Sequence, residues 1–337
     1  MNRYIRFFKK RIRKILLCLL DAFRYAYEAV SSLFDKSVRV AFTNFDPIDR
    51  SFFVDRNFNG IRFKFVKFYS PQIHFFSVFG DIKKIKKSKA PVKIFFTGEN
   101  VNSKPRIQYK GNCIPNVHLS MGFDYDEAGN YMRLPLWLIY FFAPSNSKDD
   151  IKRILSNFKK IQNKTRFCSL VSRHDNGGLR VKIHSDVSKI ASVDCPGAFL
   201  HNDDTLQNIY NDDKLLYLEQ FKFNICPENS VSKGYVTEKL FESLFSGCIP
   251  IYSGWNRNPE PDIISPDIIM WYDETDKENN EHIMNEIKRM HEDDRLFRSF
   301  VAKPYFCDTA VDKIYDMLDQ YNCRMQNLLA TWTIPKR

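Results

Sequence analysis

The first part of the chain follows a helical pattern, with apolar side chains at steps of three and four residues beside a basic face. These positions are Ile5, Phe8, Ile12, Ile15, Leu16, Leu19 and Phe23. The uncharged run within them, Ile15–Leu20, has six residues, whereas a membrane-spanning helix needs ~20. The pattern therefore predicts a basic amphipathic helix over residues 1–36 that does not cross a bilayer. It favours a helix lying on an anionic membrane surface, with docking on the protein's own surface or on a partner as the alternative.

After residue 36 the pattern changes to short apolar strands that alternate with amphipathic helices. We predict strands over residues 37–42, 61–66, 92–96, 165–171, 221–225 and 248–252. Two of these strands run into polar loops that contain glycine, at 97–100 and at 172–178. Open α/β sheets place their ligand sites at such carboxyl ends of strands. The repetition of this arrangement predicts two α/β sheets.

The pattern breaks at residues 143–147, Ala-Pro-Ser-Asn-Ser, and charged helical residues follow. We therefore place the domain junction within residues 143–164. The predicted organisation is a helix over 1–36, a first Rossmann-like domain over 37–150, a linker helix over 151–164, a second Rossmann-like domain over 165–305 and a helical tail over 306–337. The stretch 83–89 holds five lysines in seven residues and is interpreted as a solvated loop.

The positive charge of the chain is concentrated at its start. Residues 1–14 carry seven basic and no acidic side chains, which leaves +4 of the net +11 for the rest of the chain. A nucleic-acid-binding domain needs its basic residues on a folded face, so we expect no nucleic-acid partner. The eight cysteines and seven histidines show no spacing typical of a metal site. We interpret the cysteines as reduced thiols of a cytoplasmic protein and expect no structural metal.

Glu99 is the first residue that could carry chemistry. It lies in Thr-Gly-Glu-Asn, directly after the apolar strand Val92–Phe96. Burial at the end of a strand raises the pKa of a carboxyl group toward values that suit a general base. The alternative is a turn glutamate with no catalytic role.

A second candidate is the loop Asn176-Gly177-Gly178, which leads into a helix beginning at Leu179-Arg180. A helix amino terminus offers unpaired N–H groups, and an arginine in the first turn adds two parallel donors, so this arrangement suits a phosphate group. The alternative is a glycine-rich turn followed by a solvated arginine.

The most informative segment covers residues 221–252 and reads as a strand, a polar loop, a helix with a glycine stop and a second strand. Glu238 and Lys239 lie early in that helix. A carboxylate there can accept hydrogen bonds from a sugar diol, and a cation can bind a diphosphate. The alternative is an amphipathic helix whose charged side, with Glu238 and Glu242 one turn apart, faces water.

This segment, FKFNICPENSVSKGYVTEKLFESLFSGCIPIYSG, closely resembles the donor-binding signature of the α-1,3/α-1,4-fucosyltransferases. VKIFFTGEN resembles the acceptor-domain motif of the bacterial members, and GFDYDEAGNYMRLPLW resembles the segment that follows it. FCSLVSRHDNGGLRVKIHSDVSKIASVDCPG resembles the strand, arginine helix and next strand of the same family. Together the four segments cover most of residues 92–255, in the order in which the family has them.

The resemblance implies a GT-B fold, with two Rossmann-like domains facing a central cleft. It also implies roles for single residues at the donor, which is GDP-fucose. The residues matching Arg180 and Lys239 hold the diphosphate, and the residue matching Glu238 binds the ribose hydroxyls. The residues matching Asn229 and Tyr235 line the donor site, and the glutamate matching Glu99 is the proposed base.

The activity implied is an inverting transfer of L-fucose from GDP-β-L-fucose to a hydroxyl, expected at O3 of GlcNAc or Glc, with an α-1,3 or α-1,4 linkage. The acceptor would be an oligosaccharide or a lipid-linked glycan of bacterial surface glycan synthesis. No divalent metal would be required. The basic helix over residues 1–34 would place the protein on the cytoplasmic face of the inner membrane.

Two other functions remain open from the sequence. Asp124-Tyr125-Asp126 formally spells the Asp-X-Asp motif of metal-dependent GT-A glycosyltransferases that use other nucleotide sugars. A non-catalytic, membrane-bound protein that binds a nucleotide sugar is the second alternative. The acceptor sugar, the 3- or 4-linkage and the oligomeric state are not predictable from these residues.

Overall fold

The computed structural model describes residues 2–45, 50–54, 61–125, 129–158 and 164–332, with side chains from Leu16 onward. By its internal contacts the chain forms two compact units. Unit 1 comprises Met1–Phe96, Gly111–Ser120 and Asn322–Arg337, and unit 2 comprises Thr97–Lys110 and Met121–Tyr321. The domain boundaries expected from the sequence stay predictions.

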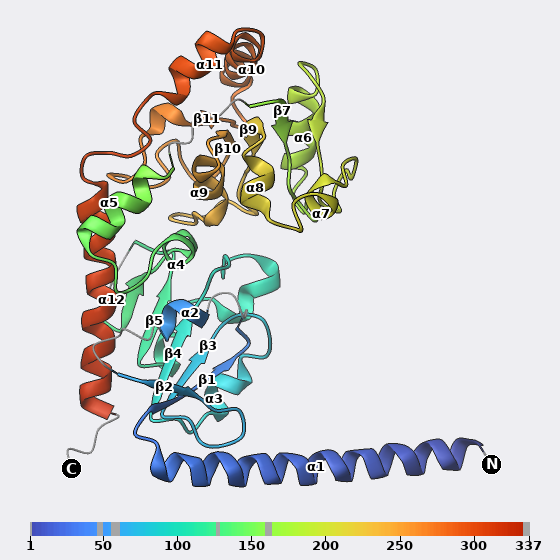
Figure 1. Cartoon of the computed structure of the whole chain (residues 1–337), viewed down its shortest axis with the longest axis vertical. Coiled ribbons are helices and arrows are strands. Elements are labelled where there is room, and N and C mark those ends of the chain that lie inside the picture. The colour runs from blue at the N-terminus through green and yellow to red at the C-terminus, as the bar shows by residue number, and fades with distance from the viewer. Residues whose placement is uncertain (1, 46–49, 55–60, 126–128, 159–163, 333–337) are drawn as a thin grey trace. The chain divides into compact units, whose positions relative to one another are not determined.

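The N-terminal half begins with a long helix and continues into a sheet with the strand order β2-β1-β3-β4-β5-β6 (Figure 1). Strand β1 pairs in parallel with β2 and β3, and β3 pairs in parallel with β4. The elements are α1 (Asn2–Phe34), β1 (Val38–Thr43), α2 (Arg50–Phe53), β2 (Phe63–Phe65), β3 (Ile73–Phe76), α3 (Lys83–Lys87), β4 (Val92–Phe96), η1 (Lys104–Tyr109), η2 (Ile114–Asn116), β5 (Leu119–Gly122) and β6 (Tyr131–Arg133).

Phenylalanine rings fill the core beside this sheet. Phe42 stacks on Phe75 with ring centroids 4.7 Å apart, and Phe45 packs edge-on against Phe53 at 5.4 Å. Such contacts stabilise the unit beyond the burial of apolar area alone. The expected solvated loop at Lys83–Lys89 is wrong, because Lys83–Lys87 form helix α3 and Ile85 between the lysines is fully buried.

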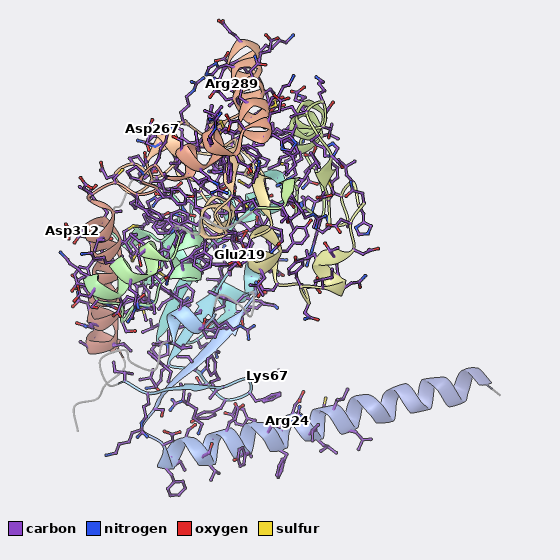
Figure 2. All side chains as sticks on the ribbon, turned by 45° about the horizontal axis from the view of Figure 1, so that its top comes forward. Arg24, Lys67, Glu219, Asp267, Arg289 and Asp312 are labelled. Carbon is purple, nitrogen blue, oxygen red and sulfur yellow. The ribbon has the colours of Figure 1, made fainter. Side chains whose placement is uncertain are left out.

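Helix α1 confirms the element expected over residues 1–36, and its last turns are docked on unit 1. The carboxylate of Glu28 accepts hydrogen bonds from the backbone N–H groups of residues 67–69 at 2.8–3.2 Å. Tyr25 packs edge-on against Tyr69, and the Arg24 guanidinium lies over the ring of Phe68. Figure 2 shows Arg24 on α1 and Lys67 on the neighbouring segment of unit 1. The docking interpretation thus holds for these turns. Within the described residues, no helix combines the length and the apolarity needed to cross a bilayer.

The C-terminal half is built on a second sheet, with the strand order β11-β10-β9-β7-β8. All four neighbouring pairs are parallel. The elements are α4 (Leu136–Phe141), α5 (Lys148–Ser156), β7 (Arg166–Ser169), α6 (Leu179–Val187), β8 (Val193–Asp194), α7 (Thr205–Asn208), α8 (Lys214–Leu218), β9 (Phe221–Ile225), α9 (Glu238–Phe245), β10 (Ile249–Tyr252), η3 (Pro266–Ile268), β11 (Met270–Trp271), α10 (Lys277–Glu292), α11 (Asp294–Val301) and α12 (Ala310–Trp332).

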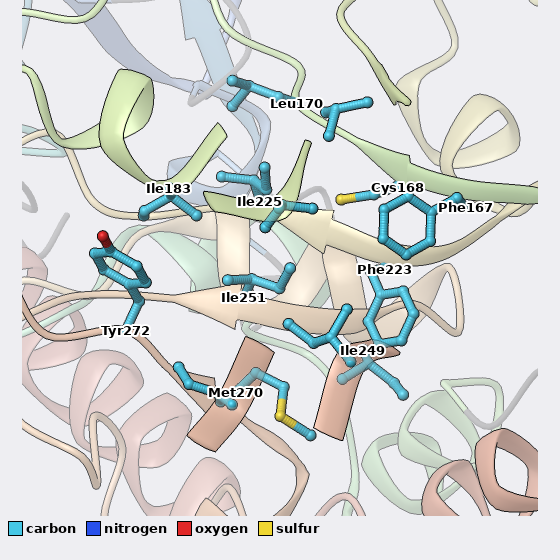
Figure 3. Close-up of a cluster of buried hydrophobic side chains, with 14 of the residues drawn as sticks. Phe167, Cys168, Leu170, Ile183, Phe223, Ile225, Ile249, Ile251, Met270 and Tyr272 are labelled. Atoms are coloured by element: carbon cyan, nitrogen blue, oxygen red, sulfur yellow. The ribbon is translucent and has the colours of Figure 1, made fainter. Parts of the chain in front are cut away.

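The core of this second sheet is built from apolar side chains of neighbouring strands and of the helices that cover the sheet, as expected for a parallel sheet. Cys168, Ile225 and Ile251 lie on three neighbouring strands and are buried together (Figure 3). Side chains of α6, α10 and α11 belong to the same cluster. This packing fixes the carboxyl ends of β7 and β9, which is where the polar loops begin.

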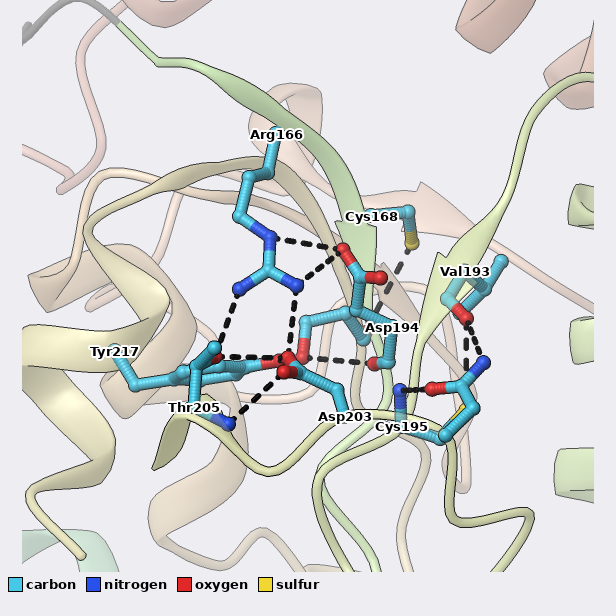
Figure 4. A network of polar contacts seen from close by, with 10 residues as sticks. Arg166, Cys168, Val193, Asp194, Cys195, Asp203, Thr205 and Tyr217 are labelled. Carbon is cyan, nitrogen blue, oxygen red and sulfur yellow. Dashed lines mark hydrogen bonds and ion pairs between the residues drawn. The ribbon is translucent and has the colours of Figure 1, made fainter. Parts of the chain in front are cut away.

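A partly buried polar network holds β7 and β8 together. Arg166 donates to Asp194 at 3.0 Å, to Asp203 at 2.8 Å and to Thr205 at 3.0 Å (Figure 4). The hydroxyl of Tyr217 also donates to Asp203, at 2.8 Å. Burial alone would raise the pKa of Asp203, but these hydrogen bonds lower it to about 2. Asp203 is therefore ionised at neutral pH, and its hydrogen bonds stabilise the frame of the loops.

Candidate functional site

A polar pocket lies at the carboxyl ends of β7 and β9 in unit 2. Its cavity volume is about 350 Å³. Four residues expected at the donor line it: Arg180, Asn229, Glu238 and Lys239. The other lining residues are Val171, Ser172, Arg173, His174, Lys214, Asn224, Ile225, Cys226 and Pro227. The loop after β7, the loop after β9 and the first turns of α6 and α9 thus bring the predicted residues together.

Arg180 forms one wall of the pocket, and its guanidinium is held by acceptors on two loops. It is only 6% exposed and donates to the side chain of Asn229 at 2.7 Å and to the carbonyl of His174 at 3.0 Å. Gly178 precedes its helix with a φ of 77°, a left-handed conformation that favours glycine. The solvated-arginine alternative is therefore wrong. Burial lowers the pKa of Arg180, although a guanidinium remains charged at neutral pH.

Lys239 also lines the pocket, with two carboxylates beside it. Its ammonium group donates to the hydroxyl of Thr237 at 2.9 Å, and it lies 3.7 Å from Glu228 and 3.5 Å from Glu238. Glu228 in turn accepts from the N–H and the hydroxyl of Thr237, at 2.8 Å and 2.7 Å. Burial opposes the charge of Lys239, but Glu238 and Glu228 raise its pKa overall. The cation is therefore permanent and rigidly held.

Glu238 presents an ionised carboxylate to the pocket. Burial raises its pKa, but the charges of Lys239 and Lys214 outweigh that effect and lower the pKa overall. Glu242, one turn further along α9, pairs with Lys214 at 2.5 Å and is mostly buried. The interpretation of this helix face as solvated is therefore wrong.

Tyr235 is buried near the pocket but is not one of the residues that line it. Its ring packs edge-on against Phe123, with centroids 4.7 Å apart. The preceding Gly234 has a φ of 74°, and a Cβ there would lie 2.3 Å from the carbonyl oxygen of Phe123. Tyr235 thus supports the loop from behind, and its predicted contact with the donor stays a prediction.

Glu99 lies in the turn after β4 and is not a lining residue of the pocket. Burial raises the pKa of Glu99 above its ordinary value, while Arg106 and Lys239 act in the opposite direction. Its backbone N–H donates to the hydroxyl of Thr97 at 3.0 Å. The next residue, Asn100, donates to the side chain of Ser230 on the loop of Asn229 at 2.9 Å. The predicted base therefore belongs to unit 2 and is electrostatically linked to the pocket.

Three further residues at the pocket, Asn224, Glu228 and Lys214, were not predicted from the sequence. Asn224 is 2% exposed and lines the pocket, and no hydrogen bond of its side chain is found among the described residues. Glu228 holds Thr237 and Lys239 as described above. Asn224 and Glu228 both lie in the motif FKFNICPENS, so the sequence indicated their place beside the donor loop but not their individual roles. Lys214 had no local signal, because only the packing of α8 against α9 brings it to the pocket.

The described part of the chain contains no group of three or more His, Cys, Asp and Glu side chains placed to hold a metal ion. The Asp-X-Asp triplet cannot be assessed as a ligand set, since Asp126 lies outside the described residues. The pocket instead carries its positive charge on fixed side chains, Arg180 and Lys239.

Family models match two long parts of the chain. The alpha-(1,3)-fucosyltransferase FucT N-terminal domain matches residues 40–140, and the C-terminal model of glycosyltransferase family 10 (fucosyltransferase) matches residues 160–329. The chain belongs to glycosyltransferase family 10. The second match contains the whole pocket, which confirms the family named from the sequence motifs.

Curated relatives resemble the family 10 chain over about half of its length. Alpha-(1,3)-fucosyltransferase FucT of Helicobacter pylori is 30% identical in an alignment of 207 residues, which covers 52% of this chain and 40% of that protein. A putative fucosyltransferase of Acanthamoeba polyphaga mimivirus is 27% identical in an alignment of 197 residues, which covers 53% of this chain and 31% of the viral protein. GDP-fucose protein O-fucosyltransferase 3 of Gallus gallus is 29% identical in an alignment of 160 residues, which covers 46% of this chain and 29% of that protein. The chain thus spans less than half the length of each.

Solved structures show the same fold. The crystal structure of an alpha1,3-fucosyltransferase aligns with a TM-score of 0.56 at 20% identity, covering 85% of this chain and 90% of that one. The same enzyme with GDP-fucose aligns with a TM-score of 0.54 over the same shares. This likeness and the two parallel sheets confirm the α/β, GT-B fold class and speak against the GT-A alternative.

Proposed function

We propose that this protein transfers L-fucose from GDP-β-L-fucose to a hydroxyl of a glycan acceptor, with inversion at the anomeric carbon. The observation that carries the proposal is the pocket itself: two buried cations, Arg180 and Lys239, face it beside the ionised carboxylate of Glu238. It lies within the match to the family 10 C-terminal model. The Helicobacter pylori relative is an alpha-(1,3)-fucosyltransferase, which supports fucose as the transferred sugar. A solved alpha1,3-fucosyltransferase of the same fold holds GDP-fucose, which supports this donor.

Electrostatic interactions bind the donor and stabilise its leaving group. Arg180 and Lys239 bind the diphosphate and stabilise the negative charge that grows on GDP as the bond to fucose breaks. The first turns of α6 and α9 add N–H groups to the same anion. Glu238 accepts hydrogen bonds from the ribose hydroxyls. Because the cations are held by hydrogen bonds before the donor binds, little reorganisation is needed during the reaction.

The acceptor end needs a base, and Glu99 takes that role. The acceptor oxygen attacks C1 of fucose in line with the leaving diphosphate, its proton passes to the Glu99 carboxylate, and the C1–O bond electrons leave with GDP. One displacement converts the β-linked donor into an α-linked product. The expected linkage is α-1,3 or α-1,4, at O3 of GlcNAc or Glc for the former.

No divalent metal takes part in the proposed reaction, because Arg180 and Lys239 supply the positive charge that a metal ion would provide. This is tested by titrating GDP into the protein in a calorimeter, with and without EDTA. We expect the same dissociation constant in both and weaker binding of UDP. A requirement for Mg²⁺ or Mn²⁺ would contradict the metal-free proposal, and equal binding of GDP and UDP would contradict the choice of donor.

The proposed acceptor is an oligosaccharide or a lipid-linked glycan of bacterial surface glycan synthesis, and the proposed location is the cytoplasmic face of the inner membrane. The support comes from α1, whose apolar side chains Leu16, Leu19 and Phe23 are exposed, the last two at 63% and 70%. Seven basic residues precede them in the sequence. A helix with this composition lies in an anionic membrane surface, apolar side inward. The docked turns around Glu28 would then tie unit 1 to the membrane.

Sedimentation with vesicles tests this attachment. The full chain is expected to sediment with vesicles rich in phosphatidylglycerol, more weakly at high salt, and Leu19→Glu/Phe23→Glu to reduce the bound fraction by roughly tenfold or more. Ile209→Glu/Leu216→Glu is the matched control, because both residues are exposed apolar positions of unit 2. Equal sedimentation of the wild type and the α1 variant would contradict the proposal.

The non-catalytic alternative makes a different prediction. A protein that only binds a nucleotide sugar would bind GDP and GDP-fucose, but it would release no GDP in the presence of any acceptor. The intact set of Glu99, Arg180, Glu238 and Lys239 favours the enzyme, since a binding protein has no use for the base.

A further inference from the structure

The turn that carries Glu99 is joined to the donor loop by one side-chain hydrogen bond. The amide nitrogen of Asn100 donates to the hydroxyl of Ser230 at 2.9 Å, across 130 positions of sequence. Asn100 is 8% exposed and Ser230 is half-buried, so this bond is partly protected from water. A hydrogen bond in such surroundings is stronger than one at the surface.

The two ends of this bond are placed next to functional groups. Asn100 follows Glu99 directly, and Ser230 follows Asn229, whose side-chain oxygen accepts from Arg180 at 2.7 Å. Two hydrogen bonds and two peptide links therefore connect the guanidinium that faces the pocket with the carboxylate proposed as base.

The turn around Glu99 does not need the bond to Ser230 for its own shape. The side-chain oxygen of Asn100 already accepts from the N–H of Asn102 at 2.9 Å, and its carbonyl accepts from the hydroxyl of Ser103 at 2.7 Å. The side-chain nitrogen of Asn100 is not used within the turn and donates to Ser230 instead. This hydrogen bond therefore joins two loops and does not shape the turn itself.

We propose that the Asn100–Ser230 hydrogen bond makes these two side chains positioning residues, which couple occupation of the donor pocket to the placement of Glu99. When a nucleoside diphosphate engages Arg180, the loop of Asn229 and Ser230 becomes fixed, and the turn of Glu99 becomes fixed with it. The base is then held more firmly while a donor is bound than in the free protein. The inference rests on the proposed function and adds to it that a bound donor strengthens the ordering of the base.

Coupling of this kind is reciprocal, so the turn and the nucleotide stabilise each other by the same factor. One hydrogen bond between neutral groups supports a factor of roughly two to ten. We therefore expect an effect of that size on GDP affinity, and the same factor in the ordering of residues 97–103.

Amide hydrogen exchange with GDP as the probe tests the coupling without any acceptor. In the wild type, GDP is expected to slow exchange of a peptide covering residues 97–103 by roughly two- to tenfold. With Ser230→Ala or Asn100→Ala that slowing should be lost while GDP still binds, and Ser230→Thr, which keeps the hydroxyl, should restore it. Ser232→Ala is the matched control on the same loop and should behave as the wild type.

Rates of transfer give the second test. Ser230→Ala and Asn100→Ala should each lower kcat, and the double variant should be no slower than the slower single variant, since all three lack the same bond. Multiplying effects in the double variant, or GDP-dependent slowing that persists in Ser230→Ala, would overturn the inference. If the wild type does not bind GDP at all, the proposed function itself fails. Binding of GDP with no slowing at 97–103 contradicts only the coupling.

Discussion

Glu99→Gln is expected to lower kcat for fucose transfer by roughly 10²- to 10⁴-fold, the usual loss when a general base is removed. Glutamine has nearly the same shape but cannot take the proton of the acceptor hydroxyl. Because Glu99 does not line the pocket, the dissociation constant for GDP should change little. The measurement is steady-state release of GDP at saturating donor, together with calorimetric titration of GDP.

The pH profile separates this role from a structural one. Burial raises the pKa of Glu99, and the group is active when deprotonated. Activity should therefore fall with decreasing pH at higher values than an exposed carboxylate would give, and that limb should be absent in Glu99→Gln. Glu278→Gln, an exposed position on α10, is the control of equal charge change. Near-normal transfer by Glu99→Gln would exclude Glu99 as the base.

Lys239→Ala is expected to weaken GDP binding by roughly 10- to 100-fold, because a hydrogen bond from a charged group contributes about 1.5 to 3 kcal/mol. The lysine side chain is 19% exposed, and Thr237 and two carboxylates hold its ammonium group in one position beside the pocket. Transfer should fall further than binding, since the same charge stabilises the leaving GDP. Calorimetric titration measures the first effect and GDP release the second.

The variant also leaves Glu228 and Glu238 without their cation, so its folding must be checked by thermal unfolding. Breaking a buried pair typically destabilises by about 3 to 5 kcal/mol. Lys239→Arg keeps the charge and should restore the unfolding temperature and part of the affinity. Lys233→Ala changes the same charge at an exposed position of the preceding loop and should leave GDP affinity unaltered. A folded Lys239→Ala that binds GDP as tightly as the wild type would contradict the assigned role.

Strands β1, β2, β4, β7, β9 and β10 were predictable because their signals are local, as were the polar loops after β4 and β7. Strands β3, β5, β6, β8 and β11 were not predicted from such signals. Val92–Phe96 and the strand around Cys168 are apolar runs that stop at glycine-containing loops, and parallel sheets bury such runs on both faces. Glu238 and Lys239 follow from their place at the start of a helix. The positions of these residues can be predicted without knowing which elements pack against them.

The features that were missed depend on tertiary contacts. Ile85 looked like one residue in a run of lysines, yet its burial turns that run into helix α3. Lys214 reaches the pocket only because α8 lies beside α9, and no pattern in its own segment shows that. The packing of the Tyr235 ring against Phe123 also depends on a tertiary contact, and the expected contact of Tyr235 with the donor stays a prediction.

The central claim is inverting transfer of fucose from GDP-fucose, and the most direct measurement is proton NMR of the product. The protein comprising residues 1–337 is incubated with GDP-β-L-fucose and either N-acetyllactosamine or lacto-N-biose, with EDTA present. The account predicts a fucosylated product whose new anomeric signal is that of an α-linked fucose. A β-linked product, or the absence of any product with these and lipid-linked acceptors despite tight GDP binding, would contradict it.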